Sequence, residues 1–156
     1  MHIRLHMQIR RATVKDTPTL IEHNILLAKE SENESLNISI VKQGVTSLFS
    51  HPEKGFYLVA EEENKVIGQL MITFEWSDWR NTDIWWIQSV YISQNYRKQG
   101  VFTTLFEEIK KQAKNKHIPI LRLYVHKGNT SAQHVYEKCK MIKGTYIFYE
   151  MPVEKP

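Results

Sequence analysis

The feature that most constrains this chain is the run from Ile84 to Ile92, with the sequence IWWIQSVYI. It is apolar on both faces apart from Gln88 and Ser89, as expected for a central strand that is covered on both sides. A polar loop follows, and from about Gly100 the apolar residues recur at helical spacing. The chain therefore places a buried strand, a loop and an amphipathic helix in direct succession.

The rest of the chain divides into predicted helices and strands. Asp16 is placed to cap a helix that runs to about Glu30, because Thr17-Pro18 then occupies the first turn, where the missing N–H of proline costs little. A second helix over Ile40 to Phe49 ends before His51-Pro52. The other predicted strands are Ile9 to Ala12, a hairpin of Phe56 to Ala60 with Val66 to Trp76, then Ile120 to Val125, and a closing strand over Thr145 to Met151. With helices from about Gly100 and over Asn129 to Cys139, the order βααβββαβαβ predicts an α/β sheet of mixed direction with helices on its faces.

The composition favours one globular domain. The 156 residues, 42% of them apolar, are enough for one sizeable core and too few to suggest two. We expect this domain to cover residues 8–156, with Met1 to Met7 as a polar upstream extension. No run approaches the roughly 18 apolar residues of a membrane span, and the first residues lack a secretory signal, so we expect a cytoplasmic protein without a membrane partner. The 21 Lys and Arg exceed the 17 Asp and Glu enough to attract a phosphate-rich ligand, but they form no nucleic-acid-binding stripe.

The cysteine and histidine residues predict neither a disulfide nor a metal site. Cys139 is the single cysteine, so an internal disulfide is ruled out and a reducing compartment fits best. No histidine lies one helical turn from Cys139, and we expect it to be a small buried hydrophobe rather than a nucleophile. The histidines weighed as metal ligands, none of which has metal-ligand spacing, are His23, His51, His117, His126 and His134.

The turn before the third helix is suited to a phosphate. Free N–H groups at a helix start carry partial positive charge, and Gly100 lets a phosphate approach the main chain closely. Arg97 and Lys98 add formal charge. The chain has neither G-x-x-x-x-G-K-[ST] nor G-x-G-x-x-G, which disfavours a nucleoside triphosphatase or a dinucleotide enzyme. For the loop in isolation, a plain strand-to-helix turn with solvated cations is the simpler interpretation.

Two segments resemble the GNAT (GCN5-related) N-acetyltransferase superfamily. The loop with Arg97 and Gly100 is similar to that family's R/Q-x-x-G-x-G/A segment, and the strand from Ser89 to Ile92 precedes it as expected. The run from Asn129 to Met141 looks like the family's N-x-x-A-x-x-x-Y-x-x-x-G-[FM] helix. Two residues depart from the pattern. Phe102 stands where many members have a small residue, and we expect it to turn into the core, whereas Lys140 stands where many have glycine.

The resemblance implies a fold, a cofactor and a set of contacts. The fold is a mixed, mostly antiparallel sheet of six to seven strands flanked by about four helices, in which the strands carrying Val90 and Leu123 splay apart. Acetyl-CoA enters the gap as co-substrate, and no metal is implied. The implied cofactor contacts are the main chain of Val90, Tyr91 and Ile92, the pyrophosphate loop Arg97, Lys98, Gln99, Gly100, Val101, Phe102 and Thr103, and then Asn129 and Tyr136 near the pantetheine and thioester.

Transfer to an amine needs a proton for the leaving thiolate and a neutral nucleophile. Tyr136 is the general-acid candidate, since it lies seven residues, about two turns, after Asn129 and can face the same cleft. The alternative is a core tyrosine with a satisfied hydroxyl. The strand Ile84 to Ile92 carries no carboxylate, and only Asp83 precedes it. Glu75 and Asp78 could draw a proton through water, and Glu75 is the candidate base.

The acceptor contacts are predicted from acidic and aromatic residues. Glu75 and Asp78 lie among Trp76, Trp79 and Trp85, and together they could surround a cationic amine. A solvated hairpin end is an equal alternative. Glu30, Glu32 and Glu34 form a second acidic candidate wall near the predicted helix junction. The substrate-binding candidates are Glu32, Trp76 and Asp78.

The chain is thus predicted to be an N-acetyltransferase that transfers the acetyl group directly to a small-molecule or peptide amine. A non-catalytic acyl-CoA-binding or regulatory module of the same fold is the alternative, and the missing strand carboxylate leaves room for it. The closing strand is suited to pairing across a homodimer.

Overall fold

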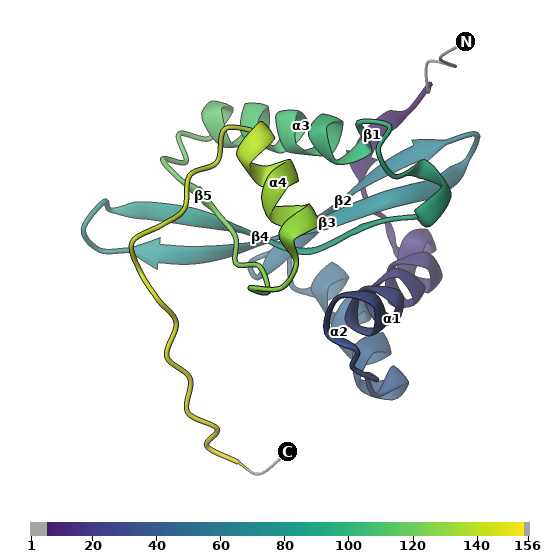
Figure 1. The fold of residues 1–156 in the computed structure, drawn as a ribbon, viewed down its shortest axis with the longest axis horizontal. Coiled ribbons are helices and arrows are strands. Elements are labelled where there is room, and N and C mark those ends of the chain that lie inside the picture. The colour runs from purple at the N-terminus through teal and green to yellow at the C-terminus, as the bar shows by residue number, and fades with distance from the viewer. Residues whose placement is uncertain (1–5, 155–156) are drawn as a thin grey trace.

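The fold is built on a five-stranded sheet in the order β1-β2-β3-β4-β5 (Figure 1). It comes from a computed structural model that describes residues 6–154; residues 1–5 of the expected N-terminal extension lie outside this part. The first four strands pair antiparallel, and β5 pairs parallel with β4. The strands are β1 Gln8–Arg11, β2 Gly55–Glu62, β3 Lys65–Ser77, β4 Thr82–Ile92 and β5 Leu121–Arg122.

Helices cover both faces of the sheet. Helices α1 (Thr17–Glu32) and α2 (Ile38–Ser50) lie on one face, and α3 (Val101–Asn115) and α4 (Thr130–Lys138) lie on the other (Figure 1). Short 3-10 helices, η1 (Val14–Asp16) and η2 (Gln94–Tyr96), precede α1 and α3. The predicted helices and the four antiparallel strands are confirmed, with ends shifted by a few residues.

The two cores follow from the alternation of side chains along the strands. On β2, Tyr57 and Val59 pack with Leu20 of α1 and Val45 of α2. The intervening residues of β2 face the opposite core, which is built on α3 around Leu105 and other residues of that helix. Because β2 is buried on both faces from Leu58 to Ala60, its sequence is apolar from Phe56 to Ala60, as the same argument predicts for β4.

The sheet departs from the prediction at its β5 edge. The described residues contain five strands rather than six to seven, β5 is two residues long rather than Ile120 to Val125, and Thr145 to Met151 forms no strand. Within the described chain, β4 pairs with β5 only at Trp85 with Leu121 and Trp86 with Arg122. Beyond these rungs the two segments diverge, and β5 leaves only a two-residue edge at this end of the sheet.

Strand β4 also carries a bulge. Gln69 pairs with Tyr91 and Met71 with Gln88, so two residues, Ser89 and Val90, oppose the single residue between Gln69 and Met71. Ser89 has φ 50°, a left-handed conformation that is costly for a residue with a side chain. The bulge therefore separates the regular part of β4 from the segment that leads into the loop.

The predicted role of Asp16 as a helix cap is wrong. Asp16 occupies the N-cap position of α1, but its side chain makes no cap hydrogen bond. Its carboxylate instead accepts from the Arg10 guanidinium at 2.8 and 2.9 Å and from the Thr13 N–H at 2.7 Å. Residues 6–154 include no helix with the length and apolarity needed to cross a membrane.

Candidate active site

The N-terminus of α3 is uncapped and exposed. Gly100 is its N-cap residue with φ 81°, and no side chain caps the helix. A Cβ built on Gly100 would meet no atom within 4 Å, so the space beside the turn is free. Val101 and Phe102 are buried, which confirms that Phe102 turns into the core. The first N–H groups of α3 are thus left for a ligand with negative charge.

The loop before α3 is tied to α1 through Arg97. The Arg97 guanidinium forms an ion pair with Glu30 and donates from Nε to the Ile92 carbonyl at 2.9 Å. Glu30 also accepts from the Tyr91 hydroxyl and from Gln94, both at 3.1 Å. Burial opposes ionisation of Glu30, but these hydrogen bonds outweigh it and hold its pKa below the ordinary value. The Arg97 charge is therefore shared with Glu30, whereas Lys98 is exposed at φ 60°.

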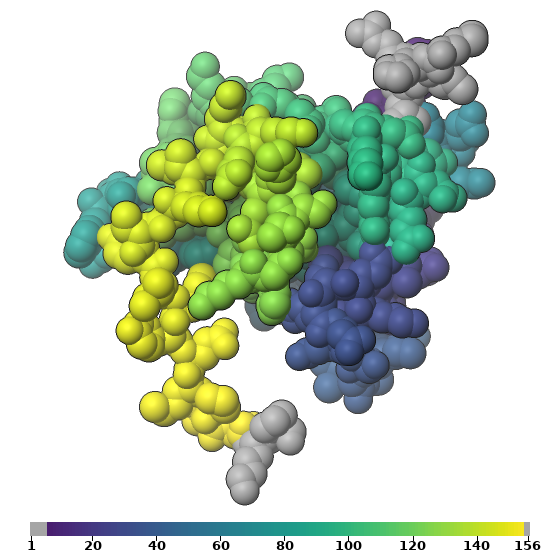
Figure 2. All heavy atoms as spheres, in the orientation of Figure 1, coloured from purple at the N-terminus to yellow at the C-terminus, as the bar shows by residue number. Residues whose placement is uncertain are grey.

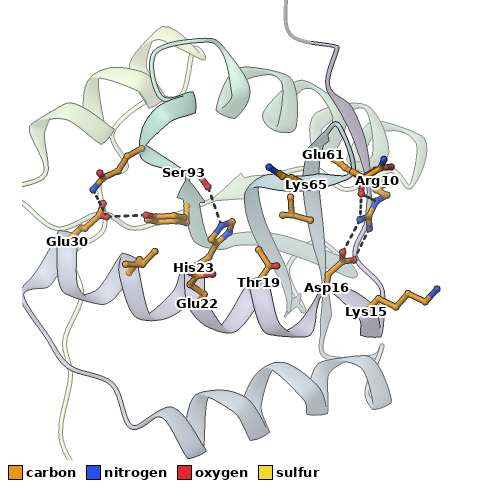
Figure 3. A pocket seen from close by; sticks show the side chains of 15 residues that line it. Arg10, Lys15, Asp16, Thr19, Glu22, His23, Glu30, Glu61, Lys65 and Ser93 are labelled. Atoms are coloured by element: carbon orange, nitrogen blue, oxygen red, sulfur yellow. Dashed lines mark hydrogen bonds and ion pairs between the residues drawn. The ribbon is translucent and has the colours of Figure 1, made fainter.

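A buried polar network holds the β4 bulge from the α1 side. Gln69 is fully buried, and its amide N–H groups donate to Asn24 at 3.0 Å and to the Ser89 carbonyl at 3.2 Å. Its Oε1 lies 3.1 Å from His23 Nδ1, which requires His23 to carry its proton there. His23 Nε2 then accepts from the Ser93 hydroxyl at 3.4 Å (Figure 3).

These contacts join both ends of the segment from Ser89 to Ser93 to one helix. The His23 ring also packs on Tyr91, with ring centroids 4.8 Å apart. Burial lowers the pKa of His23, although its hydrogen bond with Gln69 opposes the shift, and this favours the neutral ring that the network needs. A cavity of about 760 Å³ lies alongside, between α1, the β2–β3 turn and the end of β4 (Figure 3).

Tyr136 lies on α4 and packs against α3. Its ring makes an edge contact with Phe102, with centroids 5.4 Å apart. Burial raises the pKa of the Tyr136 hydroxyl, and Cys139 adds to the shift, so the group stays protonated at neutral pH. Asn129 caps α4 by accepting from the Ala132 N–H at 3.1 Å, which leaves its amide N–H groups available. Cys139 is partly buried and packs on the α3 core, as expected for a small hydrophobe.

Glu75 lies on the α1 and α2 face of the sheet, since it alternates with Phe74, which packs on the α3 core. Its carboxylate accepts from the Trp86 indole at 3.2 Å and from Arg122 at 3.1 Å. Trp86 and Arg122 form the last rung between β4 and β5. Glu75 therefore sits where the gap between these strands begins.

The other acceptor candidates do not gather around Glu75. Trp76 is 62% exposed and points to the opposite face. Asp78 lies in the turn after β3, where it accepts from the Trp79 N–H, and Glu32 is the last residue of α1. Trp85 is 3% exposed in the α3 core, so the expectation that it faces a bound amine is wrong.

Comparison with known proteins decides the family. The model of the acetyltransferase (GNAT) family matches residues 21–141, which include the bulge, the loop and α4. The chain belongs to this GNAT acetyltransferase family. Its fold is therefore one that binds acetyl-CoA, and the uncapped amides and open space at Gly100 fit a pyrophosphate.

One known protein and two solved structures are similar to this GNAT chain. Streptothricin acetyltransferase A of Bacillus subtilis (strain 168) is 29% identical over 127 residues, 80% of this chain, which spans only 65% of that relative. A possible acetyltransferase from Clostridium difficile 630 is 40% identical in a superposition with a TM-score of 0.89 that covers 96% of this chain and 99% of that chain. A predicted acetyltransferase from Clostridium acetobutylicum, determined with acetyl-CoA, is 23% identical with a TM-score of 0.77 and covers 94% and 96% of the two chains.

Lys140, which stands where the GNAT pattern often has glycine, still forms the turn that ends α4. The Lys140 N–H donates to the Glu137 carbonyl at 2.9 Å and the Met141 N–H to the Tyr136 carbonyl at 3.1 Å, a Schellman motif that ends α4. Lys140 occupies its left-handed position with φ 65°. Glycine takes this conformation without strain, so the chain keeps the turn at an energetic cost.

Sequence patterns missed several residues of this GNAT site. A Cβ on Gly68 would lie 2.7 Å from Ile92 Cδ1 and 3.1 Å from Val101 Cγ1, so this glycine lets the start of α3 pack on the sheet. Trp86 and Tyr124 form an aromatic cluster with Phe148, with ring centroids 5.2 to 6.3 Å apart. A polar Gln69 within an apolar strand was the one available signal for the buried network.

Among residues 6–154, no three His, Cys, Asp or Glu side chains are grouped to hold a metal ion.

Proposed function

We propose that this chain acetylates a primary amine with acetyl-CoA, by direct attack of the amine within a ternary complex. The observation that carries the proposal is the gap where β4 leaves β5 after Trp86. The uncapped N-terminus of α3 follows the β4 side of this gap, and α4 with Tyr136 follows the β5 side. Acetyl-CoA would supply an activated acetyl group as a thioester.

The cofactor contacts that we assign follow the chain in order. The main chain of Val90 to Ile92 has no strand on its β5 side among the described residues, so it could bond the amides of a pantetheine arm, apart from the Ile92 carbonyl, which already accepts from Arg97 Nε. Residues 97–103 would hold the pyrophosphate through the α3 amides and Lys98. Asn129 would bond the pantetheine through its free amide N–H groups.

Tyr136 is assigned as the general acid that protonates the leaving thiolate. Its raised pKa keeps the proton on the hydroxyl until a stronger base forms beside it. Glu75 is assigned as the base that draws the amine proton through water. It lies on the sheet face opposite α3 and α4, beside the gap, and its carboxylate is already oriented by Trp86 and Arg122.

The acceptor that the surroundings favour is a cationic amine. Glu75, Trp86 and Tyr124 present a carboxylate and aromatic faces to one side of the gap, a combination that attracts a cation. Arg122 pairs with Glu75 and lies over the Trp86 ring, so a bound cationic amine would take the place of Arg122 at these groups. Glu32 and Asp78 do not gather around Glu75, so the proposed acceptor charge rests on Glu75. The name of the Bacillus subtilis relative indicates a streptothricin acceptor, so a cationic antibiotic amine is the class that we propose first.

The test is a thiol-release screen with acetyl-CoA and a panel of amines that includes streptothricin, polyamines and peptides. We expect turnover with a cationic amine, and initial rates that show a ternary complex. A ping-pong pattern would contradict direct attack. Tight binding of acetyl-CoA without transfer to any amine would favour the non-catalytic module instead.

Tyr136→Phe tests the acid. We expect turnover to fall by about tenfold to a thousandfold while acetyl-CoA affinity changes little, because only the proton donor is removed. Tyr149→Phe removes the hydroxyl of a tyrosine that is 88% exposed and serves as the control. Equal turnover in the two variants would remove Tyr136 from this role.

A further inference from the structure

A second cavity lies at the C-terminal end of α3, away from the proposed site. It measures about 530 Å³, and we call it the aromatic pocket; its lining includes Arg11, Phe56, Phe74, Asp83, Trp85 and Lys116. The 15 residues of α3, which crosses the sheet in Figure 1, separate it from Gly100 by about 22 Å. The proposed transfer reaction makes no use of this pocket.

Three aromatic rings form the floor of the aromatic pocket. Phe56 on β2, Phe74 on β3 and Trp85 on β4 contact one another, with ring centroids 5.6 to 6.2 Å apart. Trp85 is buried in the α3 core, whereas Phe56 and Phe74 are only partly buried and line the pocket. Such a floor favours a ligand with a planar apolar group, because aromatic rings pack well in offset or edge-on contacts.

Arg11 stands at the rim of the pocket with its charge unpaired in the described chain. Its guanidinium lies over the Phe56 ring, 3.0 Å from the centroid, and donates to the Gln112 side-chain oxygen at 3.0 Å. The neighbouring Arg10 pairs with two carboxylates, whereas Arg11 pairs with no carboxylate of residues 6–154. Burial lowers the pKa of Arg11, the direction expected when a cation loses water without gaining an opposite charge. Most of its N–H donors thus remain available for an anion.

The other charged groups around the pocket also favour an anion. Lys116 is a second cation, and Asp83 is the one carboxylate among the described residues of the lining. Gln112 donates to Glu108 at 2.9 Å, so the Gln112 amide stands between that carboxylate and Arg11. The partial negative charge at the end of α3 is satisfied locally, because the carbonyls of residues 112–114 accept from the main-chain N–H groups of residues 116–118.

The described chain leaves the aromatic pocket open. Residues 142–154 leave α4, and their final part lies clear of the helices and the sheet (Figure 2). None of these residues lines the pocket. Its volume is within the range of small-molecule sites, which combine an apolar lining with a few placed polar groups. The pocket is therefore suited to a small ligand from solution.

We propose that the aromatic pocket binds a small aromatic carboxylate, with its ring on Phe56 and Phe74 and its carboxylate on Arg11 and Lys116. A guanidinium presents a planar fork that matches a carboxylate with two parallel N–H···O bonds, and the Phe56 ring orients this fork. The Asp83 carboxylate disfavours a second negative charge, so the ligand class is a monoanion.

Calorimetry and amide NMR spectra of the full chain test the proposal, with phenylacetate as the probe. We expect phenylacetate to bind and to shift the amide signals of residues 55–56, 82–83 and 116–118, but not those of residues 97–103. Phenylacetamide has the same ring without the charge, and it should bind at least about tenfold more weakly because a charge-assisted hydrogen bond is lost. Saturating acetyl-CoA should not displace phenylacetate.

Arg11→Met removes the guanidinium but keeps an apolar stem over Phe56, so it should weaken phenylacetate binding by at least about tenfold. Lys111→Met is the matched control, because it removes one positive charge from the exposed side of α3, outside the pocket. Circular dichroism confirms that both variants keep the fold. The comparison of the two probes on the wild type depends on neither variant.

Four results would overturn the proposal. Phenylacetate that does not bind leaves the pocket without its ligand class, and equal binding of phenylacetamide removes the role of the charge. An equal loss in Arg11→Met and Lys111→Met would mean that only the overall charge of the surface attracts the anion. Displacement by acetyl-CoA, with shifts confined to residues 97–103, would place phenylacetate in the proposed cofactor site instead.

Discussion

Gln69→Met is the perturbation that best tests how the β4 bulge is held. Methionine fills a similar volume but cannot bond His23, Asn24 or the Ser89 carbonyl, which Gln69 contacts at 3.0 to 3.2 Å. Each buried hydrogen bond contributes about 1 kcal/mol net, so we expect the free energy of unfolding to fall by about 3 kcal/mol. Urea denaturation measures this loss.

The same variant should weaken acetyl-CoA binding. Ser89 is held at φ 50°, which costs about 1 to 3 kcal/mol for a residue with a side chain. Without the Gln69 hydrogen bond to the Ser89 carbonyl, a conformation of β4 that has lost the bulge can compete with the bulged one. If this relaxed conformation becomes about 1.4 kcal/mol more stable than the bulged one, only about a tenth of the molecules can bind acetyl-CoA. The apparent dissociation constant then rises about tenfold.

Gln88→Met is the matched control on the neighbouring strand. Gln88 makes one side-chain hydrogen bond, to Thr73 at 2.6 Å, and its loss should cost about 1 kcal/mol or less without affecting acetyl-CoA affinity by calorimetry. The reasoning fails if Gln69→Met costs no more stability than Gln88→Met. It also fails if folded Gln69→Met binds acetyl-CoA as the wild type does.

Two further predictions concern stability. Lys140→Gly should stabilise the chain by about 1 kcal/mol, seen as a rise of about 2 to 4 °C in melting temperature, whereas Lys140→Ala should not, because alanine keeps the Cβ that strains φ 65°. Asp16→Asn should lower the free energy of unfolding by about 2 kcal/mol at pH 7, because the hydrogen bond from Arg10 lowers the pKa of Asp16 below its ordinary 3.8. A folded pKa that is lowered stabilises above the ordinary value and is lost on acidification, so the difference from wild type should shrink in denaturation curves below about pH 3.8; a constant difference would refute it.

Local patterns were sufficient for the elements that carry the cofactor loop. From Ile84 onward, consecutive residues change from an unbroken apolar run, typical of a buried strand, to apolar residues at helical spacing. Gly100 takes the left-handed conformation at the N-cap of the helix. Phe102 was placed correctly for the same reason, since its helical face decides its burial.

Long-range geometry decided the parts that the sequence could not predict. Periodicity does not reveal a one-residue slip such as the bulge at Ser89, nor a contact between His23 and Gln69, which lie 46 residues apart. Asp16 was misassigned because the cap position does not reveal a competing partner: Arg10, six residues earlier on β1, binds its carboxylate. The closing strand failed because strand propensity does not supply an edge to pair with.

The proposed site has a cofactor half and an acceptor half, and the chain builds them in different ways. The proposed cofactor half consists of one continuous segment, from Ser89 to Thr103, and α1 holds it through His23, Asn24 and Glu30. The proposed acceptor half is assembled from segments that meet only in the fold, namely Glu75 on β3, Trp86 on β4, and Tyr124 with Phe148 after β5. Substitutions in the second set can change the amine while leaving the loop and its glycine unaltered. We therefore expect acceptor preference to change with substitutions in the aromatic cluster of Trp86, Tyr124 and Phe148, and acetyl-CoA affinity to change with substitutions in α1.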